Sequence, residues 1–349
     1  MRKGYGIVIK ERNRGEKMKG ITLADIARAT GFSVNTVSHA LHDKPDISEE
    51  TKKRIKAKAE EMGYIVNTSA SALRSGKTRS IAIIIGDIAN PFFSILTKEM
   101  EKCLREYNYS SLVLNTDEDE ALEKAAIISA ISKNVDGIIL CPVQKTRKNL
   151  DFLKNSGIPY LLIGRYFQGD DSGYVVCDDF NSGYVAAKHL IDLNHKRLLF
   201  INAPLYISGA YLRLEGVKRA IMEAADHEVS LSVVEIDALG NAERICPILQ
   251  EYADCTGIIC FSDMIAMQVC HFLKTLGKQV PRDVSVIGFD NIVSRLLSPL
   301  MLTSVSVSKT SMSVKAVETL MKIIAGEKDT LQQHILPTRV ILWDSTAQK

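Results

Sequence analysis

Regular alternation of short apolar runs with longer amphipathic stretches constrains the fold of this 349-residue chain more than any other feature. The apolar runs are Ile81–Ile85, Ser111–Leu114, Gly137–Cys141, Tyr160–Ile163, Tyr174–Cys177, Leu198–Ile201, Gly257–Phe261 and Ser285–Phe289. Helical periodicity occupies Phe92–Tyr107, Leu122–Lys133, Asn181–Leu193, Leu212–Ala225 and Ile265–Leu276. Strands that alternate with helices form parallel sheets covered by helices. From Ser80 onward we therefore predict an α/β region of two doubly wound, Rossmann-like lobes.

Polar and aromatic residues directly follow most of these apolar runs. They are Asp87, Asn90, Phe92, Phe93, Gly164, Arg165, Asp178, Asp179, Asn202, Ser262, Asp263, Asp290 and Asn291, and Arg213 is expected just before the helix that follows Asn202. Ligands of such sheets bind outside the carboxyl ends of the strands. Any one of these residues alone is more often part of a surface loop or a helix cap. Their recurrence predicts a cleft with apolar faces and polar edges, suited to a sugar or a nucleobase.

The N-terminal part of the chain is basic and the remainder is slightly acidic. Residues 1–79 contain 17 Lys and Arg against 9 Asp and Glu, a net charge of +8, and the other residues contain 27 against 32, a net charge of −5. This asymmetry fits a nucleic-acid-binding module attached to a domain without that role. A solvated charged face would give the same balance, so the charge needs support from a motif.

Residues 21–41 have the pattern of two short helices joined by a tight turn. Thr22 with Asp25 three residues later is a helix-start signal. Gly31 supplies the turn, and Ser33 is placed to cap the second helix. This arrangement predicts a helix-turn-helix unit.

Two further residues and a third helix complete that unit. Ala27 is small enough to let two helices cross closely, and Val37 is a branched apolar residue that can hold the second helix in place. A third helix is predicted from Ser48 to Met62, ended by Gly63.

The second helix of such a unit enters the major groove of DNA, and its N-terminal residues meet base edges. Asn35 can pair with adenine, His39 can donate to guanine, and Val34 can touch a thymine methyl group. Thr36 and Ser38 suit phosphate contacts. A plain helical hairpin would share the spacing, but spacing and basic charge together favour DNA binding.

Three motifs here resemble the headpiece of the LacI–GalR repressor family: Thr22-Leu-Ala-Asp-Ile-Ala27, Gly31-Phe-Ser-Val-Asn-Thr-Val-Ser38 and Ile47-Ser-Glu-Glu-Thr51. The similarity continues to about Thr346 through several motifs in the family's order. It implies a helix-turn-helix headpiece (residues 21–66, with Thr22 and Ser33 also at the DNA), a hinge (67–79) and an effector-binding and dimerisation core of periplasmic-binding-protein type (80–349). The implied N-lobe spans about 80–178 and 308–335, and the C-lobe about 179–306 and 336–349.

The resemblance also assigns a role to the hinge, which by itself reads as a flexible linker. In the family this segment becomes helical on DNA, pairs with its dimer mate and enters the minor groove. Leu73 matches the residue wedged between base pairs, and Asn67 and Arg74 match further DNA contacts. Val66 stands where the family often has Pro, so the hinge is expected to begin less sharply here.

The resemblance identifies the cleft residues position by position. It implies effector contacts from Asn90, Phe92, Phe93, Arg165, Asp178, Arg213, Asp263 and Asp290. Ribose is disfavoured by Gly164, Ser262 and Val307, which stand where an acidic residue, Asn and Gln are common. Ile207 and Ile236 likewise depart from the purine-binding branch. We expect a pentose or hexose, or an acid derived from one.

The expected partners are a pseudo-palindromic double-stranded operator, a small-molecule effector and a second copy of the chain. Headpieces that read two half-sites imply a dimer, with contacts that include the helix beginning near Pro91. Residues 1–20 lie outside the resemblance and are expected to be an N-terminal extension. Met18-Lys-Gly-Ile-Thr resembles the first residues of such a headpiece, so we expect translation to start at Met18. We expect a cytoplasmic protein, since no secretory signal or apolar run of 18 residues is present and the seven cysteines form no Cys-x-x-Cys pair.

Two other classes of protein fit less well. An enzyme would need a nucleophile with its base, a metal cluster or a phosphate loop, and none of these motifs occurs, so we expect no catalytic residue, metal or cofactor. A periplasmic sugar-binding protein without DNA function would share the core. The headpiece and the missing signal argue against it.

Overall fold

The computed structural model describes residues 21–65, 76–224, 228–237, 242–292, 301–327 and 332–349. The chain divides into two units, residues 1–75 and residues 76–349. The expected start at Met18 and the hinge residues Asn67, Leu73 and Arg74 lie outside the described residues.

The first unit is a three-helix bundle made of α1 (Leu23–Thr30), α2 (Val34–Leu41) and α3 (Glu49–Glu61). Thr22 and Asp25 form a capping box at α1, Gly31 ends it in the left-handed conformation, and Ser33 caps α2. These local signals fix short helices that would be marginal alone. The three helices bury Ile26, Ala27, Val37, Ala40, Ile55 and Ala59 between them. The predicted helix-turn-helix arrangement is confirmed.

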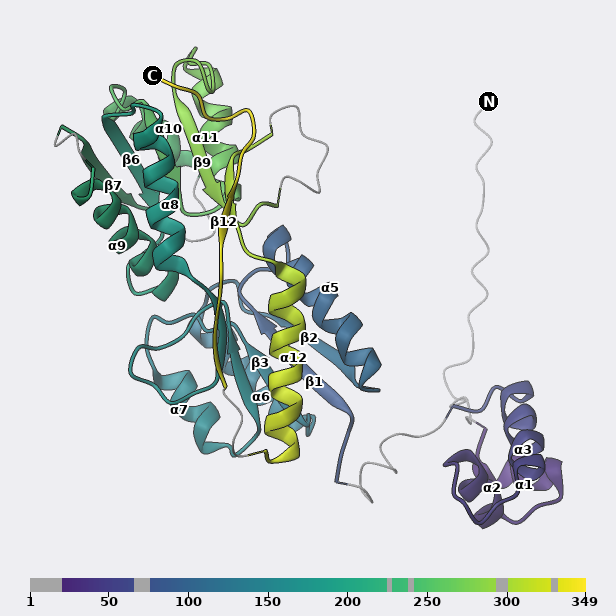
Figure 1. Cartoon of the computed structure of the whole chain (residues 1–349). Coiled ribbons are helices and arrows are strands. Elements are labelled where there is room, and N and C mark those ends of the chain that lie inside the picture. The colour runs from purple at the N-terminus through teal and green to yellow at the C-terminus, as the bar shows by residue number, and fades with distance from the viewer. Residues whose placement is uncertain (1–20, 66–75, 225–227, 238–241, 293–300, 328–331) are drawn as a thin grey trace, which may run out of the picture. The chain divides into compact units, whose positions relative to one another are not determined.

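The second unit consists of two lobes, each built around a parallel-dominated sheet (Figure 1). The N-lobe contains β1 (Ser80–Ile85), α5 (Pro91–Glu106), β2 (Ser110–Asn115), α6 (Glu120–Ser132), β3 (Gly137–Leu140), α7 (Lys148–Asn155), β4 (Tyr160–Ile163), β5 (Tyr174–Cys177), α12 (Lys309–Ala325) and β11 (Gln333–Leu336). Its strand order is β11-β5-β4-β3-β1-β2, and every pairing in it is parallel.

The C-lobe repeats this plan with later segments of the chain. It contains α8 (Asp179–Asp192), β6 (Arg197–Asn202), α9 (Ser208–Met222), β7 (Ser230–Glu235), α10 (Ala242–Glu251), β8 (Gly257–Cys260), α11 (Asp263–Thr275), β9 (Ser285–Phe289), β10 (Ser304–Ser306) and β12 (Arg339–Ile341). Its strand order is β12-β10-β9-β8-β6-β7, and only the β10–β12 pairing is antiparallel. Two doubly wound lobes were predicted, and each of the eight apolar runs forms a strand.

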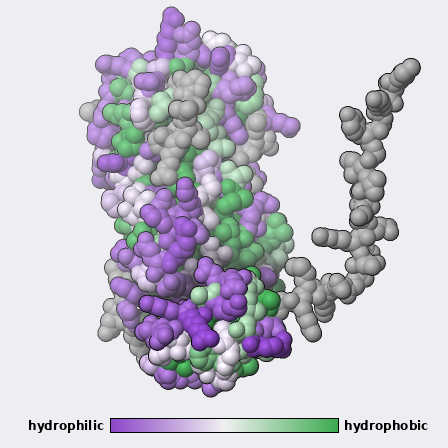
Figure 2. Space-filling model, turned by 90° about the vertical axis from the view of Figure 1, so that its right-hand side faces the viewer, coloured by the Kyte–Doolittle hydropathy of each residue, from purple (hydrophilic) through white to green (hydrophobic). Residues whose placement is uncertain are grey.

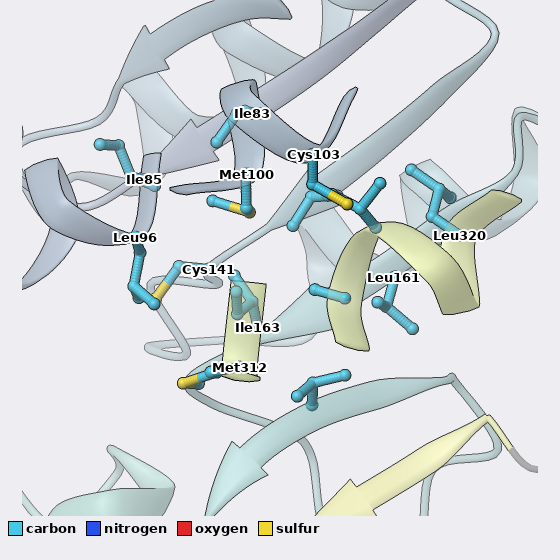
Figure 3. Packing of buried hydrophobic residues seen from close by; sticks show 14 of the residues in the cluster. Ile83, Ile85, Leu96, Met100, Cys103, Cys141, Leu161, Ile163, Met312 and Leu320 are labelled. Carbon is cyan, nitrogen blue, oxygen red and sulfur yellow. The ribbon is translucent and has the colours of Figure 1, made fainter. Parts of the chain in front are cut away.

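Helices cover both faces of each sheet. In the N-lobe, α5 and α12 pack side by side on one face, where Met100 and Leu320 meet β1 and β4 side chains such as Ile83 and Leu161 (Figure 3). The other face packs against α6 and α7. Burial on both faces explains why the central strands are almost wholly apolar.

In the C-lobe, α8 and α9 approach each other unusually closely, and two glycines permit it. A Cβ atom on Gly216 would lie 2.0 Å from the carbonyl oxygen of Phe180, and one on Gly183 would lie 1.9 Å from that of Arg213. No larger side chain fits at either position without moving a helix. This contact fixes where α9 carries Arg213 relative to the start of α8.

The chain crosses between the lobes three times: after β5, after β10 and after β11. Residue 178, residues 307–308 and residues 337–338 connect the flanking elements. The lobes are therefore each built from two separate pieces of sequence. Among the described residues, no helix is both long and apolar enough to cross a membrane.

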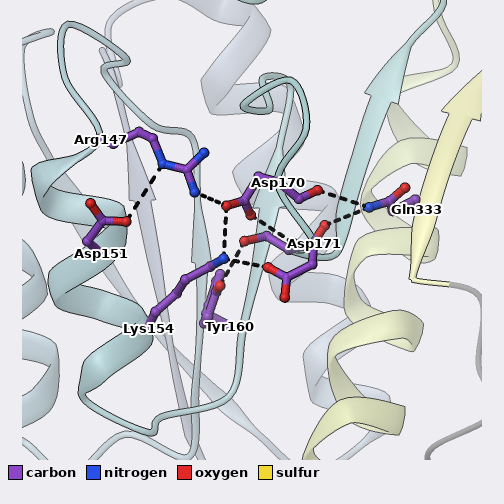
Figure 4. A network of polar contacts seen from close by, with 8 residues as sticks. Arg147, Asp151, Lys154, Tyr160, Asp170, Asp171 and Gln333 are labelled. Carbon is purple, nitrogen blue, oxygen red and sulfur yellow. Dashed lines mark hydrogen bonds and ion pairs between the residues drawn. The ribbon is translucent and has the colours of Figure 1, made fainter.

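A polar network holds the outer side of the N-lobe together (Figure 4). The side chain of Asp170, in the segment between β4 and β5, accepts hydrogen bonds from Arg147 and Lys154. Gln333 of β11 donates to the main-chain oxygens of Asp170 and Ser172. The network thus ties α7, the segment before β5 and the edge strand β11 to one another.

Candidate functional site

A cavity lies between the two lobes, at the carboxyl ends of the strands of both sheets. Asn90, Phe92 and Phe93 reach it from the start of α5, and Arg165 from the end of β4. Asp290, which follows β9, reaches it from the C-lobe. The cavity therefore occupies the place at which doubly wound sheets bind ligands.

Aromatic rings form the apolar walls of the cavity. Phe92 and Phe93 stand edge to face, with ring centroids 5.3 Å apart, and Phe261 lines the cavity from the opposite lobe. Phe92 packs against the buried clusters of both lobes. Flat apolar faces of this kind suit the face of a sugar or base ring.

Arg165 is held by a carboxylate. Its Nη1 lies 2.7 Å from Oε2 of Glu118 and its Nη2 lies 2.8 Å from Oε1, and Nη1 also donates to the main-chain oxygen of Pro142 at 3.1 Å. Glu118 follows β2 and also lines the cavity. The pair is a bidentate, charge-assisted one, the strongest geometry for such a contact.

Arg213 is held by different groups in the C-lobe. Its Nε donates to Asp179 at 2.8 Å and its Nη1 donates to the main-chain oxygen of Phe261 at 2.6 Å. Its guanidinium carbon lies 4.8 Å and 4.4 Å from the ring centroids of Phe261 and Phe289. Cation–π contact and the ion pair together orient the guanidinium in the cavity wall.

Asp290 has an unusual backbone for a non-glycine residue, with φ of 96°. Nζ of Lys309 donates to its main-chain oxygen. Burial raises the pKa of the Asp290 carboxyl, although Arg213 and Lys309 lower it. Such conformations persist only where surrounding contacts impose them, and they concentrate at functional sites.

Two thiols, those of Cys141 and Cys177, also line the cavity. Burial raises the pKa of the Cys141 thiol to about 12 and raises that of Cys177. Protonated thiols are poor nucleophiles, so both behave as small apolar side chains. All seven cysteines of the chain are free.

The structure places two predicted cleft residues outside the lining of this cavity. Asp178 caps α8, where its Oδ1 accepts the N–H of Asn181 at 2.9 Å. Asp263 is fully buried, and its carboxylate accepts bonds from Ser304 Oγ at 2.7 Å and from the N–H of Ile292 at 2.8 Å. Both carboxylates support the backbone around the cleft rather than face it.

Other predicted positions need smaller corrections, and several lining residues, Glu118 among them, were not predicted. Arg213 lies inside α9 rather than before it, because that helix begins at Ser208. Asp178 and Asp179 both follow the strand Tyr174–Cys177, and Asp178 was expected to be the effector contact, but Asp179 is the one that lines the cavity. Glu118 was overlooked, although it follows the predicted strand Ser111–Leu114 and the rule of polar residues after strands would have found it.

The predicted DNA-reading residues lie at the start of α2. Ser33, Val34 and Asn35 are exposed, and Val34 leaves 48% of its surface uncovered although it is apolar. Thr36 bonds to the Ser33 cap through its N–H (3.1 Å) and its hydroxyl (2.9 Å). An exposed apolar residue beside Asn35 fits contact with base edges in the major groove.

The remaining predicted DNA contacts of the headpiece make bonds of their own. Ser38 and His39 are partly exposed on α2. Nδ1 of His39 lies 2.6 Å from Oδ2 of Asp46, a contact that the sequence did not indicate. The Thr22 hydroxyl caps α1 and donates to Asp25 at 2.7 Å.

Comparison with known proteins gives the family. Residues 22–67 match bacterial regulatory proteins of the lacI family, and residues 187–346 match the periplasmic binding protein-like domain. The chain is 30% identical to catabolite control protein A of Priestia megaterium over 333 residues, which covers 93% of this chain and 99% of that relative. The chain belongs to the LacI family. Membership makes it a DNA-binding transcriptional regulator, since the curated relatives carry that role.

Solved structures of LacI-family proteins share the fold. The lac repressor dimer bound to operator and the anti-inducer ONPF superposes with a TM-score of 0.81 at 19% identity, over 94% of this chain and 100% of that one. A LacI family regulator from Enterococcus faecium with bound ribose gives a TM-score of 0.69 at 25% identity, over 77% of this chain and 99% of that one.

Proposed function

We propose that this LacI-family regulator is a repressor that binds a pseudo-palindromic operator as a homodimer. A sugar or sugar derivative in the cleft between the lobes controls its affinity for that operator. The observation that carries this proposal is the composition of the cavity, in which aromatic walls from both lobes adjoin three carboxyl groups and two arginines. The bound ribose of the Enterococcus faecium relative supports the choice of ligand class.

On the DNA side, the proposal gives α2 the role of reading bases. Val34, Asn35 and His39 would meet base edges, and Thr22, Ser33, Thr36 and Ser38 would meet the backbone. Asn67, Leu73 and Arg74 are proposed to enter the minor groove.

The dimer is proposed to form through the core, with α5 among its contacts. α5 lies on the right of the core in Figure 1, the side that faces the viewer in Figure 2. On that face, hydrophobic residues gather near the middle of the two-lobed unit. Apolar surface near the middle of a face is what a stable subunit contact needs.

Control of DNA binding is proposed to be a linkage between cleft and hinge. Effector binding favours one angle between the lobes, and that angle sets the spacing of the two hinges in the dimer. Hinges that form helices on DNA then gain or lose their binding geometry. The same scheme serves an inducer or a co-repressor, depending on which lobe angle the effector prefers.

Leu73→Ala tests the DNA half of the proposal. The variant should lose operator affinity, because an apolar wedge and the bend it stabilises are removed. Fluorescence anisotropy with a DNA site selected from a random library measures this, and effector affinity of the full chain, measured by calorimetry, should stay unchanged. Equal operator binding by variant and unmodified chain would contradict a wedge role. No DNA binding at low salt by either would favour a sugar-binding protein without DNA function.

A thermal-shift screen of the full chain tests the effector half. Pentoses, hexoses, sugar acids, sugar phosphates, nucleosides and purine bases form the panel. A ligand at a hundred times its dissociation constant stabilises the folded state by about 2.7 kcal/mol, enough to raise the melting temperature by several degrees. The hit should disappear in Asp290→Asn and persist in Asp192→Asn, which changes an exposed carboxylate on α8. If none of the sugars or sugar derivatives raised the melting temperature, that result would contradict the proposal.

A further inference from the structure

The two arginines of the cleft differ in the groups to which they already donate hydrogen bonds. Nη1 and Nη2 of Arg165 donate to the two carboxylate oxygens of Glu118, at 2.7 and 2.8 Å. The two side chains are enclosed, with only 11% and 8% of their surfaces exposed. A phosphate or carboxylate ligand would use the same fork of N–H groups. Glu118 therefore fills the position in which Arg165 would receive an anion.

The fold makes specific room for Glu118 at this place. Glu118 has a left-handed backbone with φ of 56°, which points its carboxylate back over the end of β1. Gly86 lies there, and a Cβ atom on it would be 2.2 Å from Oε1 of Glu118. A side chain at residue 86 would displace the carboxylate from Arg165. The Glu118–Arg165 pair thus depends on Gly86, at the end of β1, and on the left-handed turn at Glu118, after β2.

The remaining charges of the cavity give an anion no better place. The charged lining residues are Glu118, Asp179, Asp290, Arg165 and Arg213, three carboxyl groups against two guanidinium groups. Arg213 donates to Asp179 and to a main-chain oxygen. An anionic ligand would therefore find both guanidinium groups already paired with carboxylates and would lie beside three acidic side chains in a partly dehydrated site, which is costly.

An uncharged ligand meets no such obstacle. The contacts with Glu118 and Pro142 use three of the five N–H groups of Arg165. The other two remain able to donate single bonds to a hydroxyl or ring oxygen. Carboxylates such as Asp290 accept bonds from hydroxyl groups.

We propose that Glu118 is a specificity-determining residue that restricts the effector to uncharged polyhydroxylated molecules and excludes their phosphate esters and acids. The inference rests on the proposed function, since it takes the cleft to be the effector site. It narrows the expected ligand class, which included sugar acids. Removal of the Glu118 charge should turn the cleft into an anion site, because Arg165 would then present its fork to the ligand.

The test uses Glu118→Gln in the full chain and inorganic phosphate as the probe. Calorimetric titration at constant ionic strength should detect no phosphate binding by the unmodified chain. The variant should bind phosphate with a dissociation constant at least ten-fold below the weakest that the titration can detect, and Glu118→Gln with Arg165→Gln should lose that binding. Asp192→Asn is the matched control, because it removes an exposed carboxylate paired with Lys188 and should gain nothing.

Two results would overturn the inference: phosphate binding by the unmodified chain that depends on Arg165, or a folded Glu118→Gln variant that gains none. Should that variant fail to fold, ribose and glucose are compared with ribose 5-phosphate and glucose 6-phosphate on the unmodified chain. A phosphate ester that raises the melting temperature through an Arg165-dependent site overturns the inference, and esters without effect support it. The titration with inorganic phosphate can be carried out without knowing the effector. If no sugar raised the melting temperature, that result would therefore count against the proposed function and not against the role of Glu118.

Discussion

At the scale of single residues, the contact between His39 and Asp46 bears on how α2, the helix proposed to read DNA, would meet a base. Asp46 lies between α2 and α3, and its carboxylate holds Nδ1 of His39. The hydrogen bond from His39 lowers the pKa of Asp46, so this carboxylate stays ionised. Nε2 of His39 is then the ring nitrogen left to meet a base. In a neutral ring that nitrogen accepts a hydrogen bond, and in a protonated ring it donates one.

This arrangement predicts that Asp46 orients the ring of His39 for base contact. Asp46→Asn should weaken discrimination at the base pair that His39 is proposed to meet, because the ring loses the carboxylate that holds Nδ1. Anisotropy measured with operators that differ at one base pair should show a loss of about 1–3 kcal/mol of discrimination.

The charged groups around the pair provide the control. Lys44 acts on Asp46, and Asp43 forms its own pair with Lys56 on α3. Asp43→Asn removes a nearby carboxylate that pairs with Lys56 instead of His39 and should leave the discrimination intact. Equal discrimination by Asp46→Asn and by the unmodified chain would show that Asp46 does not orient the ring.

At the scale of elements, the network around Asp170 joins α7, the segment before β5 and β11. The Asp170 side chain is 2% exposed, whereas that of Asp171, which contacts the same Lys154, is 91% exposed. Burial raises the pKa of Asp170, but hydrogen bonds from Lys154 and Ser172 outweigh it and lower the pKa to about 2. Its unfolded pKa is close to 3.8. The pair therefore contributes stability above about pH 4 that is lost as the pH falls towards 2.

Asp170→Asn should accordingly destabilise the core in a pH-dependent way. The free energy of unfolding at pH 7, measured with urea, should fall by about 2 kcal/mol, the value that corresponds to the shift in pKa. The difference between variant and unmodified chain should shrink at pH 3.5. Asp171→Asn should change little at either pH, because exposed ion pairs are screened by water. If Asp170→Asn lowered the free energy of unfolding equally at pH 7 and pH 3.5, the effect would come from packing and not from the charge of Asp170.

The same scale shows what the sequence can reveal about elements. Seven of the eight predicted strands lie inside their sheets, and burial on both faces makes them apolar. The eighth, β2, is an edge strand that was found because its run Ser111–Leu114 is apolar although it is only partly covered. β7, β11 and β12 were not predicted; they are edge strands without a buried residue. β10 has only three residues. Strands at a sheet edge therefore give a less dependable signal than strands covered on both faces.

Prediction of the cleft depended on helix starts as much as on strand ends. The rule of polar residues after strands located Asn90, Arg165 and Asp290, because the end of a buried strand is sharp. It did not separate Asp178 from Asp179, because one residue decides between a cap and a lining position. The Glu118–Arg165 pair joins residues 47 apart in the sequence. Sequence periodicity carries no information on such a pairing.

At the scale of the whole molecule, Gln144 fastens the lobes to each other. Its Oε1 accepts the N–H of Ser208 at 3.0 Å, and its Nε2 donates to the main-chain oxygen of Tyr166 at 2.8 Å. Gln144 belongs to the N-lobe, and Ser208 begins α9 of the C-lobe. Tyr166 N–H also donates to the Ser208 hydroxyl at 3.3 Å. These hydrogen bonds join the two lobes directly, so they favour the lobe angle of this structure.

Gln144→Ala should therefore weaken effector binding. Each lost hydrogen bond contributes about 0.5–1.5 kcal/mol, so the dissociation constant should rise by roughly three- to ten-fold through a less populated closed state. Calorimetry with the effector found in the screen measures this change. Gln279→Ala, in a turn of the C-lobe remote from the cleft in sequence, serves as the control. An unchanged dissociation constant in Gln144→Ala would mean that the lobes close without this contact.

The three crossings between the lobes also affect how the chain can fold while the ribosome synthesises it. The ribosome delivers the chain from its N-terminus, yet the N-lobe lacks α12 and β11 until residues 309–336 have been made. Until then, α5 has no neighbouring helix, and Met100 and Leu104, fully buried in the finished molecule, lack part of their cover. Nearly all of the C-lobe is synthesised before the N-lobe can close. A nascent chain cut short before residue 309 would thus present an open apolar face to the chaperones and proteases that survey new proteins.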